Sequence, residues 1–194
     1  TMPQGNPRNV RVGPGWLYFA PLDTPEPTDL DTPWETVDPS WVQVGYTDTG
    51  SSFVFNTTAE DVMVAEELDP IETLETSRVI DITFAAAELT AQNMQLAFNG
   101  GEVETGTGIV VFEPPPTGDS TPIMIGWESD DGLERWVYRR CRQVGSVTIN
   151  RQRVPNKATL PLTFRATKPA NDEHGDPVKP FKFIHAEEYE LVGS

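Results

Sequence analysis

Apolar and polar residues alternate along most of this chain, and the alternation predicts a protein built mainly of β-strands. The clearest stretch is residues 80–86, IDITFAA, in which apolar side chains occupy every second position. A period of two places them on one face of a strand. We extend this strand to 71–89, and similar patterns predict further strands at 15–21, 41–46, 53–55, 61–67, 108–113, 123–128, 133–142, 145–151, 157–166 and 181–188.

One short segment has helical spacing instead. Thr90 is a suitable N-cap, and Met94, Ala97 and Phe98 fall on one side of the helix that it would begin. The Gly-Gly pair at 100–101 supplies the stop. A helix of two or three turns is not stable alone, so we expect its apolar side to pack on the sheet.

Glycine, proline and aspartate mark the connections. SDDG at 129–132 predicts a tight hairpin turn, because Asp-Gly tolerates a positive φ. GSS at 50–52 predicts a second turn. Pro161 interrupts the strand at 157–166, which indicates either a sheet edge or an unpaired backbone N–H.

Length and strand count together predict the architecture. The chain has 194 residues, which suits a single domain spanning 1–194, with long loops at about 22–40, 66–72 and 167–180. Nine or ten strands around one helix favour a two-sheet antiparallel sandwich or barrel with one short flanking helix.

Charge is distributed very unevenly along the chain. The net charge is −16, and the first hundred residues carry 16 acids against 3 bases. Seven carboxylates fall between Glu60 and Glu75 without a single Lys or Arg. Self-repulsion opposes such a concentration in a soluble domain, so the block indicates a surface whose role depends on being negative. The balance also argues against the usual nucleic-acid binder, which needs a basic face.

The second half carries the cations. Six arginines lie on or beside the strands predicted at 133–142 and 145–151: Arg135, Arg139, Arg140, Arg142, Arg151 and Arg153. They could form a nucleic-acid patch or simply a positive face that balances the acidic one. A third reading is that subunits pair acidic first-half surface against basic second-half surface, head to tail, which generates rings or filaments.

No motif for catalysis or for a cofactor stands out. The single cysteine, Cys141, excludes an intramolecular disulfide and a multi-cysteine zinc site, and we expect it to be buried on a strand. His174 lies in a polar loop without EF-hand spacing, and His185 lies on a strand. We expect no enzyme activity and no cofactor. The five tryptophans keep open a carbohydrate-binding or glycan-hydrolysing β-sandwich, although core aromatics are commoner.

Targeting signals are also missing from the sequence as given. No apolar run reaches the length of a membrane span, and residues 1–13 lack the apolar core of a signal peptide. We expect a protein that is cytosolic when made, or assembled from a cytosolic pool.

Four passages resemble one family, the major tail tube proteins of long-tailed, non-contractile bacteriophages, most closely those of actinobacterial hosts. The passages are Val12–Phe19, Thr58–Pro70, Arg78–Gly101 and Arg139–Thr167. The third has a long strand that leads into the short helix. The last contains a basic strand, a turn and the run PNKATLP at 155–161.

The resemblance implies a fold and an assembly. The family fold has two packed antiparallel sheets with one flanking helix. Hexameric rings stack, through a long hairpin loop and the termini, into a tube that delivers genome DNA. It also implies a place in the virion tail, assembly in the host cytoplasm, and tape measure, tail tip and tail terminator proteins as partners. A tail terminator or head–tail connector remains an alternative.

Two hypotheses about residues follow. The first is that some acids face the channel or lie on the stacking loop, among Glu60, Asp61, Glu66, Glu67, Glu72, Glu75, Asp81 and Glu88. An acidic channel would repel DNA and let it slide, because DNA carries a negative charge about every 1.7 Å of its axis. The second is that the six arginines form ion pairs between subunits or between rings.

Overall fold

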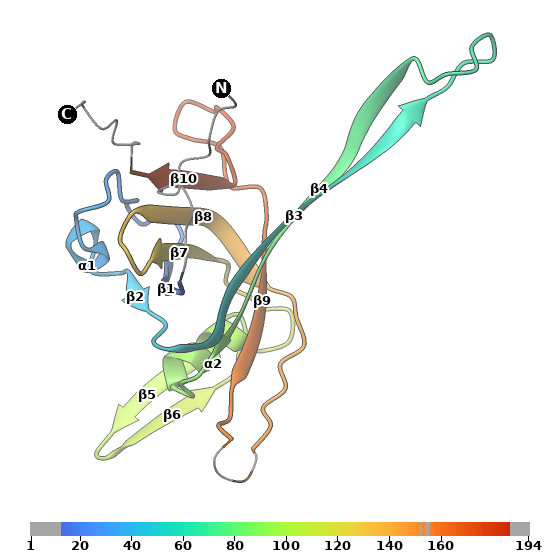
Figure 1. Cartoon of the computed structure of the whole chain (residues 1–194). Coiled ribbons are helices and arrows are strands. Elements are labelled where there is room, and N and C mark those ends of the chain that lie inside the picture. The colour runs from blue at the N-terminus through green and yellow to red at the C-terminus, as the bar shows by residue number, and fades with distance from the viewer. Residues whose placement is uncertain (1–12, 152, 154–155, 187–194) are drawn as a thin grey trace, which may run out of the picture.

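The computed structural model describes residues 13–151, 153 and 156–186 (Figure 1). The elements in chain order are β1 (Gly15–Pro21), α1 (Trp34–Val37), β2 (Val42–Gln43), β3 (Thr47–Val62), β4 (Glu72–Ala86), α2 (Ala91–Ala97), β5 (Glu102–Gly106), β6 (Ile109–Glu113), β7 (Ile123–Ser129), β8 (Glu134–Gln143), β9 (Leu160–Ala166) and β10 (Phe181–His185). The fold is mainly β, as the alternating pattern predicts.

Most strands belong to one antiparallel sheet in the order β2-β1-β7-β8-β9-β4-β3. One edge of β8 pairs with β7, and its other edge is shared by two strands: β10 pairs with residues 134–138 and β9 with residues 141–143. The sheet therefore divides at β8. One part carries β10, β7, β1 and β2, and the other carries β9, β4 and β3. β5 and β6 form a separate two-stranded sheet.

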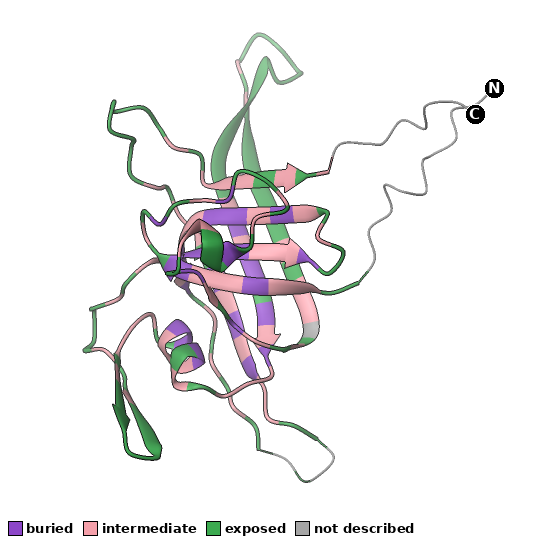
Figure 2. Cartoon of the chain, turned by 90° about the vertical axis from the view of Figure 1, so that its left-hand side faces the viewer, coloured by how far each residue is buried: buried purple, intermediate pink, exposed green. Residues whose placement is uncertain are grey.

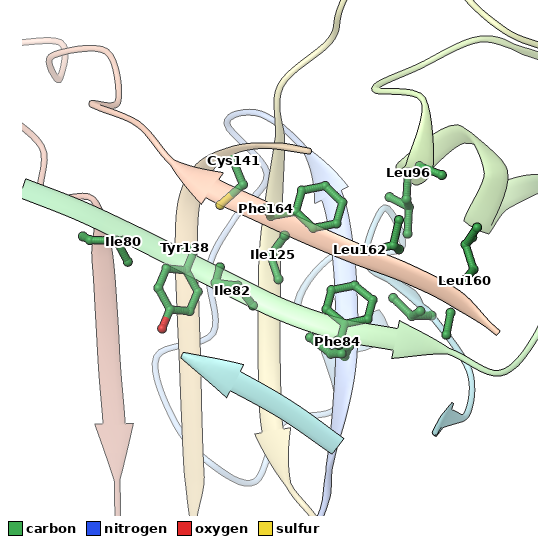
Figure 3. Packing of buried hydrophobic residues seen from close by; sticks show 14 residues of the cluster. Ile80, Ile82, Phe84, Leu96, Ile125, Tyr138, Cys141, Leu160, Leu162 and Phe164 are labelled. Atoms are coloured by element: carbon green, nitrogen blue, oxygen red, sulfur yellow. The ribbon is translucent and has the colours of Figure 1, made fainter. Parts of the chain in front are cut away.

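The two parts of the sheet pack face to face, which agrees with the predicted sandwich. Phe53 of β3 contacts the rings of Trp127, Trp136 and Tyr138 on β7 and β8, with centroids 5.6–5.9 Å apart. Between the layers lies a core that includes Leu17, all inward residues of 80–86, and Leu160, Leu162 and Phe164 of β9 (Figure 3). Buried positions alternate with more exposed ones along these strands (Figure 2).

The helix α2 lies where the sequence predicts it. Its N-cap Thr90 accepts a hydrogen bond at Oγ1 from the backbone N–H of Asn93, 3.1 Å away. Leu96 and Ala97 are buried and join the main core. The chain leaves the helix through Asn99 at φ 57° and Gly100 at φ 131°, so the predicted glycine stop is correct.

Several strand limits differ from the prediction. The turn expected at 50–52 is wrong, because β3 continues through it with a register shift between Thr47 and Ser51. Gly50 has φ 84° there, and a bulge accommodates that conformation without ending the strand. The strand expected at 61–67 is instead the end of β3 and a connection, and the strand expected at 71–89 is β4, shorter at both ends.

The strand expected at 145–151 is also wrong. The backbone N–H groups of Val144 and Gly145 still donate to the carbonyl of Thr163, at 2.8 and 3.3 Å. However, residues 145–151 themselves do not form a strand. Pro161 does not lie on an edge strand, since β9 runs between β8 and β4. However, β8 pairs with β9 only at Phe164–Ala166, so the chain at Pro161 has a strand partner on the β4 side alone.

Both the turn at 129–132 and the burial of Cys141 match the expectation. The N–H of Gly132, at φ 67°, donates to the carbonyl of Ser129 over 2.9 Å between β7 and β8. Cys141 is fully buried on β8, and burial raises the pKa of its thiol far above the ordinary value. The sequence reading missed α1, which lies in the proline-rich loop and carries Trp34 into a second small core against Trp41 and Val137.

Gly126 of β7 provides a stability test of this second core. An added Cβ would overlap the six-membered ring of Trp34. Gly126→Ala should therefore cost about 1–3 kcal/mol in the free energy of unfolding, the usual range for overpacking, measured by urea denaturation. The matched control is Gly106→Ala on exposed β5, where the nearest atom is a side-chain carbon of Ile109 at 3.2 Å. Equal losses at both positions would contradict the tight packing of Trp34 on β7.

Candidate assembly surfaces

The outer part of the β3–β4 hairpin projects from the body (Figure 1). Ile80 is the first residue of β4 that pairs with β9. Residues 56–79 lie outside this pairing and form an arm, in which the two strands pair with each other and with no other described strand. No described residue of the arm is buried. A two-stranded ribbon without a third strand or a helix against it is only marginally stable in water, so contact with another surface would stabilise the arm.

The arm holds most of the predicted acids. Six of the eight lie on it and are exposed: Glu60, Asp61, Glu66, Glu67, Glu72 and Glu75. Asp69, in the connection between the strands, is also exposed, and the prediction left it out although it lies in the same acidic run. Within the arm, Glu75 forms an ion pair with Arg78 at 2.8 Å, and Thr73 donates a hydrogen bond to Asp61 at 2.7 Å.

The other two predicted acids are in the body and have partners there. Asp81 accepts two hydrogen bonds from the guanidinium of Arg165 across the β4–β9 pair, at 2.8 and 2.9 Å. Glu88 accepts a hydrogen bond from the backbone N–H of Tyr46 at 3.0 Å. The structure therefore does not bring all eight acids together.

Exposed apolar side chains accompany the arm's charge. Met63, Ile71 and Leu74 are about half exposed, and Leu68 at the tip is 97% exposed. The prediction considered only charge here, although these residues stand out in an otherwise polar segment. In addition, β3 is the last strand in the sheet order, so its outer edge leaves backbone groups unpaired over a long strand. An uncovered edge of this kind is a ready template for pairing with another chain.

Two of the six predicted arginines are engaged within the chain. Arg135 is 2% exposed, lies 3.1 Å from the Glu128 carboxylate, and donates to the carbonyls of Asp29 and Thr32 at 3.0 and 2.8 Å. Its guanidinium also lies over the Trp34 ring. Arg139 forms an ion pair with Glu26 at 2.5 Å. Both residues fasten the proline-rich loop to β8, which does not fit a role in pairing subunits.

The other four arginines have no ion-pair partner among the described residues. Arg140 and Arg142 are half-buried on β8, while Arg151 and Arg153 are exposed in the connection between β8 and β9. The six do not lie on neighbouring strands as predicted, since residues 145–151 form no strand. The structure thus separates a structural pair from a group that could meet another subunit.

The tryptophan side chains do not form an exposed aromatic surface on which a sugar could stack. Each of the five packs against another aromatic ring: Trp16 on Tyr46, Trp34 on Tyr18 and Trp41, and Trp127 and Trp136 on Phe53. All five are buried or half-buried. A cleft of about 540 Å³ lies between the loops at 22–28 and 169–178, yet the Glu26 carboxylate in it is already paired with Arg139. Neither feature resembles an aromatic platform for glycans.

Metal and membrane features are also missing from the described part of the chain. No group of three or more His, Cys, Asp or Glu side chains there could hold a metal ion. His174 is exposed in its loop, and His185 stacks on Phe183 with ring centroids 5.2 Å apart. None of the described helices has the length and apolar character that crossing a membrane would require.

Comparison with known proteins identifies the family. A family model described as phage tail tube protein matches residues 3–186, nearly the whole chain. No curated protein matches the sequence closely enough to count as a relative. The match agrees with the resemblance carried by the four sequence passages, and the mainly β fold with its few helices is consistent with it. The chain therefore belongs to the phage tail tube protein family and is a structural protein of the virion tail.

Proposed function

We propose that this protein forms hexameric rings that stack into the tail tube, and that the tube conducts genome DNA into the host cell. The observation that carries the proposal is the arm, whose exposed apolar tip and two unsupported strands have no partner among the residues that the structure describes. The hexamer follows from the family resemblance. The tube would assemble in the host cytoplasm and meet the tape measure, tail tip and tail terminator proteins.

The positions of the projecting elements favour contacts in which one surface of a copy meets a different surface of the next copy. The arm leaves one end of the body, and both views place the β5–β6 hairpin and the β8–β9 connection at the opposite end (Figures 1 and 2). Two different surfaces at opposite ends allow head-to-tail contacts when one surface is complementary to the other. Such heterologous contacts build rings when the rotation closes and filaments when it does not.

The outer edge of β3 supports strand pairing between neighbours within a ring. β3 runs over 16 residues, Thr47–Val62, with only β4 beside it. Pairing of this edge with a neighbour would satisfy the free backbone groups and support the arm. Repeated around a ring, the arrangement would give a continuous β-lined wall.

The acids on the arm support a role at the channel wall or between rings. DNA is repelled by negative charge, so an acidic wall would let it pass without binding. The six arm acids of the prediction, together with Asp69, are the candidates that the exposure favours. Asp81 and Glu88 are weaker candidates because their carboxylates have partners in the body. Among the arginines, Arg140, Arg142, Arg151 and Arg153 remain for contacts between copies.

Negative-stain electron microscopy of the purified chain tests this function. The expected result is tubes, or rings with a central hole, that appear as the protein is concentrated. A dispersed monomer at all concentrations would overturn the proposal, and affinity for glycans in the same preparation would favour the carbohydrate-binding alternative. The matched family is the tail tube family, which lends no support to the terminator or connector alternatives.

A further inference from the structure

The hairpin formed by β5 and β6 is a second projection of the molecule, separate from the arm. Its two strands pair with each other and with no other strand of the described chain. It is attached to the body mainly through α2: Phe112 contacts Phe98 with centroids 5.7 Å apart, and Gln95 donates a hydrogen bond to the carbonyl of Gly101 at 2.9 Å. The rest of the hairpin extends away from the sandwich (Figure 1).

Its surface is unusually apolar for an exposed ribbon. Three consecutive β-branched residues of β6 are open to solvent, with Ile109 63%, Val110 57% and Val111 41% exposed. Two strands with uncovered faces are marginal in water, and exposed side chains of this kind, gathered in one place, mark an interaction surface. The hairpin is therefore expected to be covered in the assembled protein.

Charge on the hairpin indicates what covers it. Glu102, Glu104 and Glu113 are exposed, and Glu102 lies directly opposite Glu113 in the register. Like charges at opposed positions destabilise a strand pair. Residues 100–115 contain no Lys or Arg, and none of these three glutamates has an ion-pair partner among the described residues. A basic partner would relieve the repulsion.

The chain itself carries such a partner. From Gln143 to Asn171 there is no acidic residue, and this stretch contains the connection between β8 and β9. Arg151 and Arg153 are exposed in that connection, and Val144 at its start is 50% exposed. It therefore offers both charges of the opposite sign and an apolar contact.

The hairpin and the described part of the connection lie at the same end of the body and diverge from each other (Figures 1 and 2). Within one copy, the glutamates of the hairpin and the arginines of the connection could pair only if the two elements moved from these positions. In a ring whose axis runs from this end of the body toward the arm, neighbouring copies lie side by side at the same height. Two divergent elements at one end are thus placed to meet between neighbours.

We propose that the β5–β6 hairpin of one copy docks on the basic β8–β9 connection of the adjacent copy in the same ring, with Glu102 and Glu104 facing Arg151 and Arg153. This inference rests on the ring assembly proposed above. It assigns a contact within a ring to the hairpin, whereas the outer end of the arm, beyond Val62, remains available to the next ring.

A charge swap on the full chain tests the pairing. The variants are E102K with E104K, R151E with R153E, and the combination of all four. The control for E102K with E104K is E173K with D176K, which makes the same change in net charge in the exposed β9–β10 connection. Assembly is measured as the concentration at which half of the protein sediments, with negative-stain images of each sample. Circular dichroism checks that each variant is folded.

Each pair of substitutions should raise the half-assembly concentration by about tenfold or more, because like charges would then face each other across the contact. The combined variant should assemble near the wild-type concentration, and the control should behave as wild type. Single pairs that assemble normally, or a combined variant that does not recover, would overturn the inference while leaving the ring proposal intact. Wild-type protein that forms no rings would instead refute the proposed function.

Discussion

Removing the arm should abolish tube assembly and leave the body folded. Thr58 lies opposite Ser77 in the register, so residues 59–76 can be replaced by Asn-Gly, which closes a two-residue hairpin turn. The deletion removes all seven clustered carboxylates and the four exposed apolar residues of the arm. No residue of the core lies in the deleted segment, so thermal unfolding should change little.

Sedimentation and negative-stain images measure the effect. Wild-type protein should move largely into the pellet as tubes, and the shortened variant should remain in the supernatant at every concentration tested. A useful control is E173Q with D176N, which removes two exposed charges far from the arm in sequence and should assemble normally. If the shortened chain still formed tubes of ordinary length, the arm would not be the contact that the proposed function requires.

Glu128→Leu should cost more stability than Gly126→Ala. Glu128 is the carboxylate beside Arg135, which is 2% exposed, and it also accepts a hydrogen bond from Trp34 at 2.5 Å. Removing it leaves a buried guanidinium without its counter-ion and an indole N–H without its acceptor. Loss of one partner of a buried pair costs about 3–5 kcal/mol.

Urea denaturation of the monomer measures this loss. The matched control is Glu75→Leu, which removes the same side chain from the Glu75–Arg78 pair, where the side chains are 41% and 50% exposed. That pair is screened by water, so its removal should change the unfolding midpoint little. If both substitutions shifted the midpoint equally, the buried network would not hold the proline-rich loop to β8 as the distances indicate.

Sequence predicted well those elements whose determinants are local. The cap at Thr90 and the glycines after α2 specify the helix, and the alternation from Ile80 to Ala86 specifies both a strand and its buried face. The Asp-Gly turn at 131–132 joins β7 to β8 as expected. In each case the signal and the structure it produces lie within a few residues of each other.

The errors arose where distant segments decide the outcome. Gly50 predicts a turn, yet pairing of β3 with β4 on both sides of it keeps the strand continuous through a bulge. Arg135 was grouped with surface cations, because nothing near it in sequence reveals that Asp29, Thr32 and Trp34 surround it. The edge position of β3 likewise depends on the order of the whole sheet.

The acidic block is the part of the candidate surface that the sequence located best. Its concentration of charge predicted an exposed element, and the arm is one. The apolar residues among those acids were overlooked, although Leu68 is the most exposed large hydrophobic residue of the described chain. Together they describe a contact surface better than charge alone does.

The most direct test of the account is a cryo-electron microscopy reconstruction of the particles that the purified chain forms. We expect a hollow tube of stacked six-fold rings, with the free edge of β3 paired to a neighbour and the arm reaching the adjacent ring. The acids of the arm should line the channel or the contact between rings. Solid fibres, open sheets, or a tube with all of these acids on its outer wall would contradict the account.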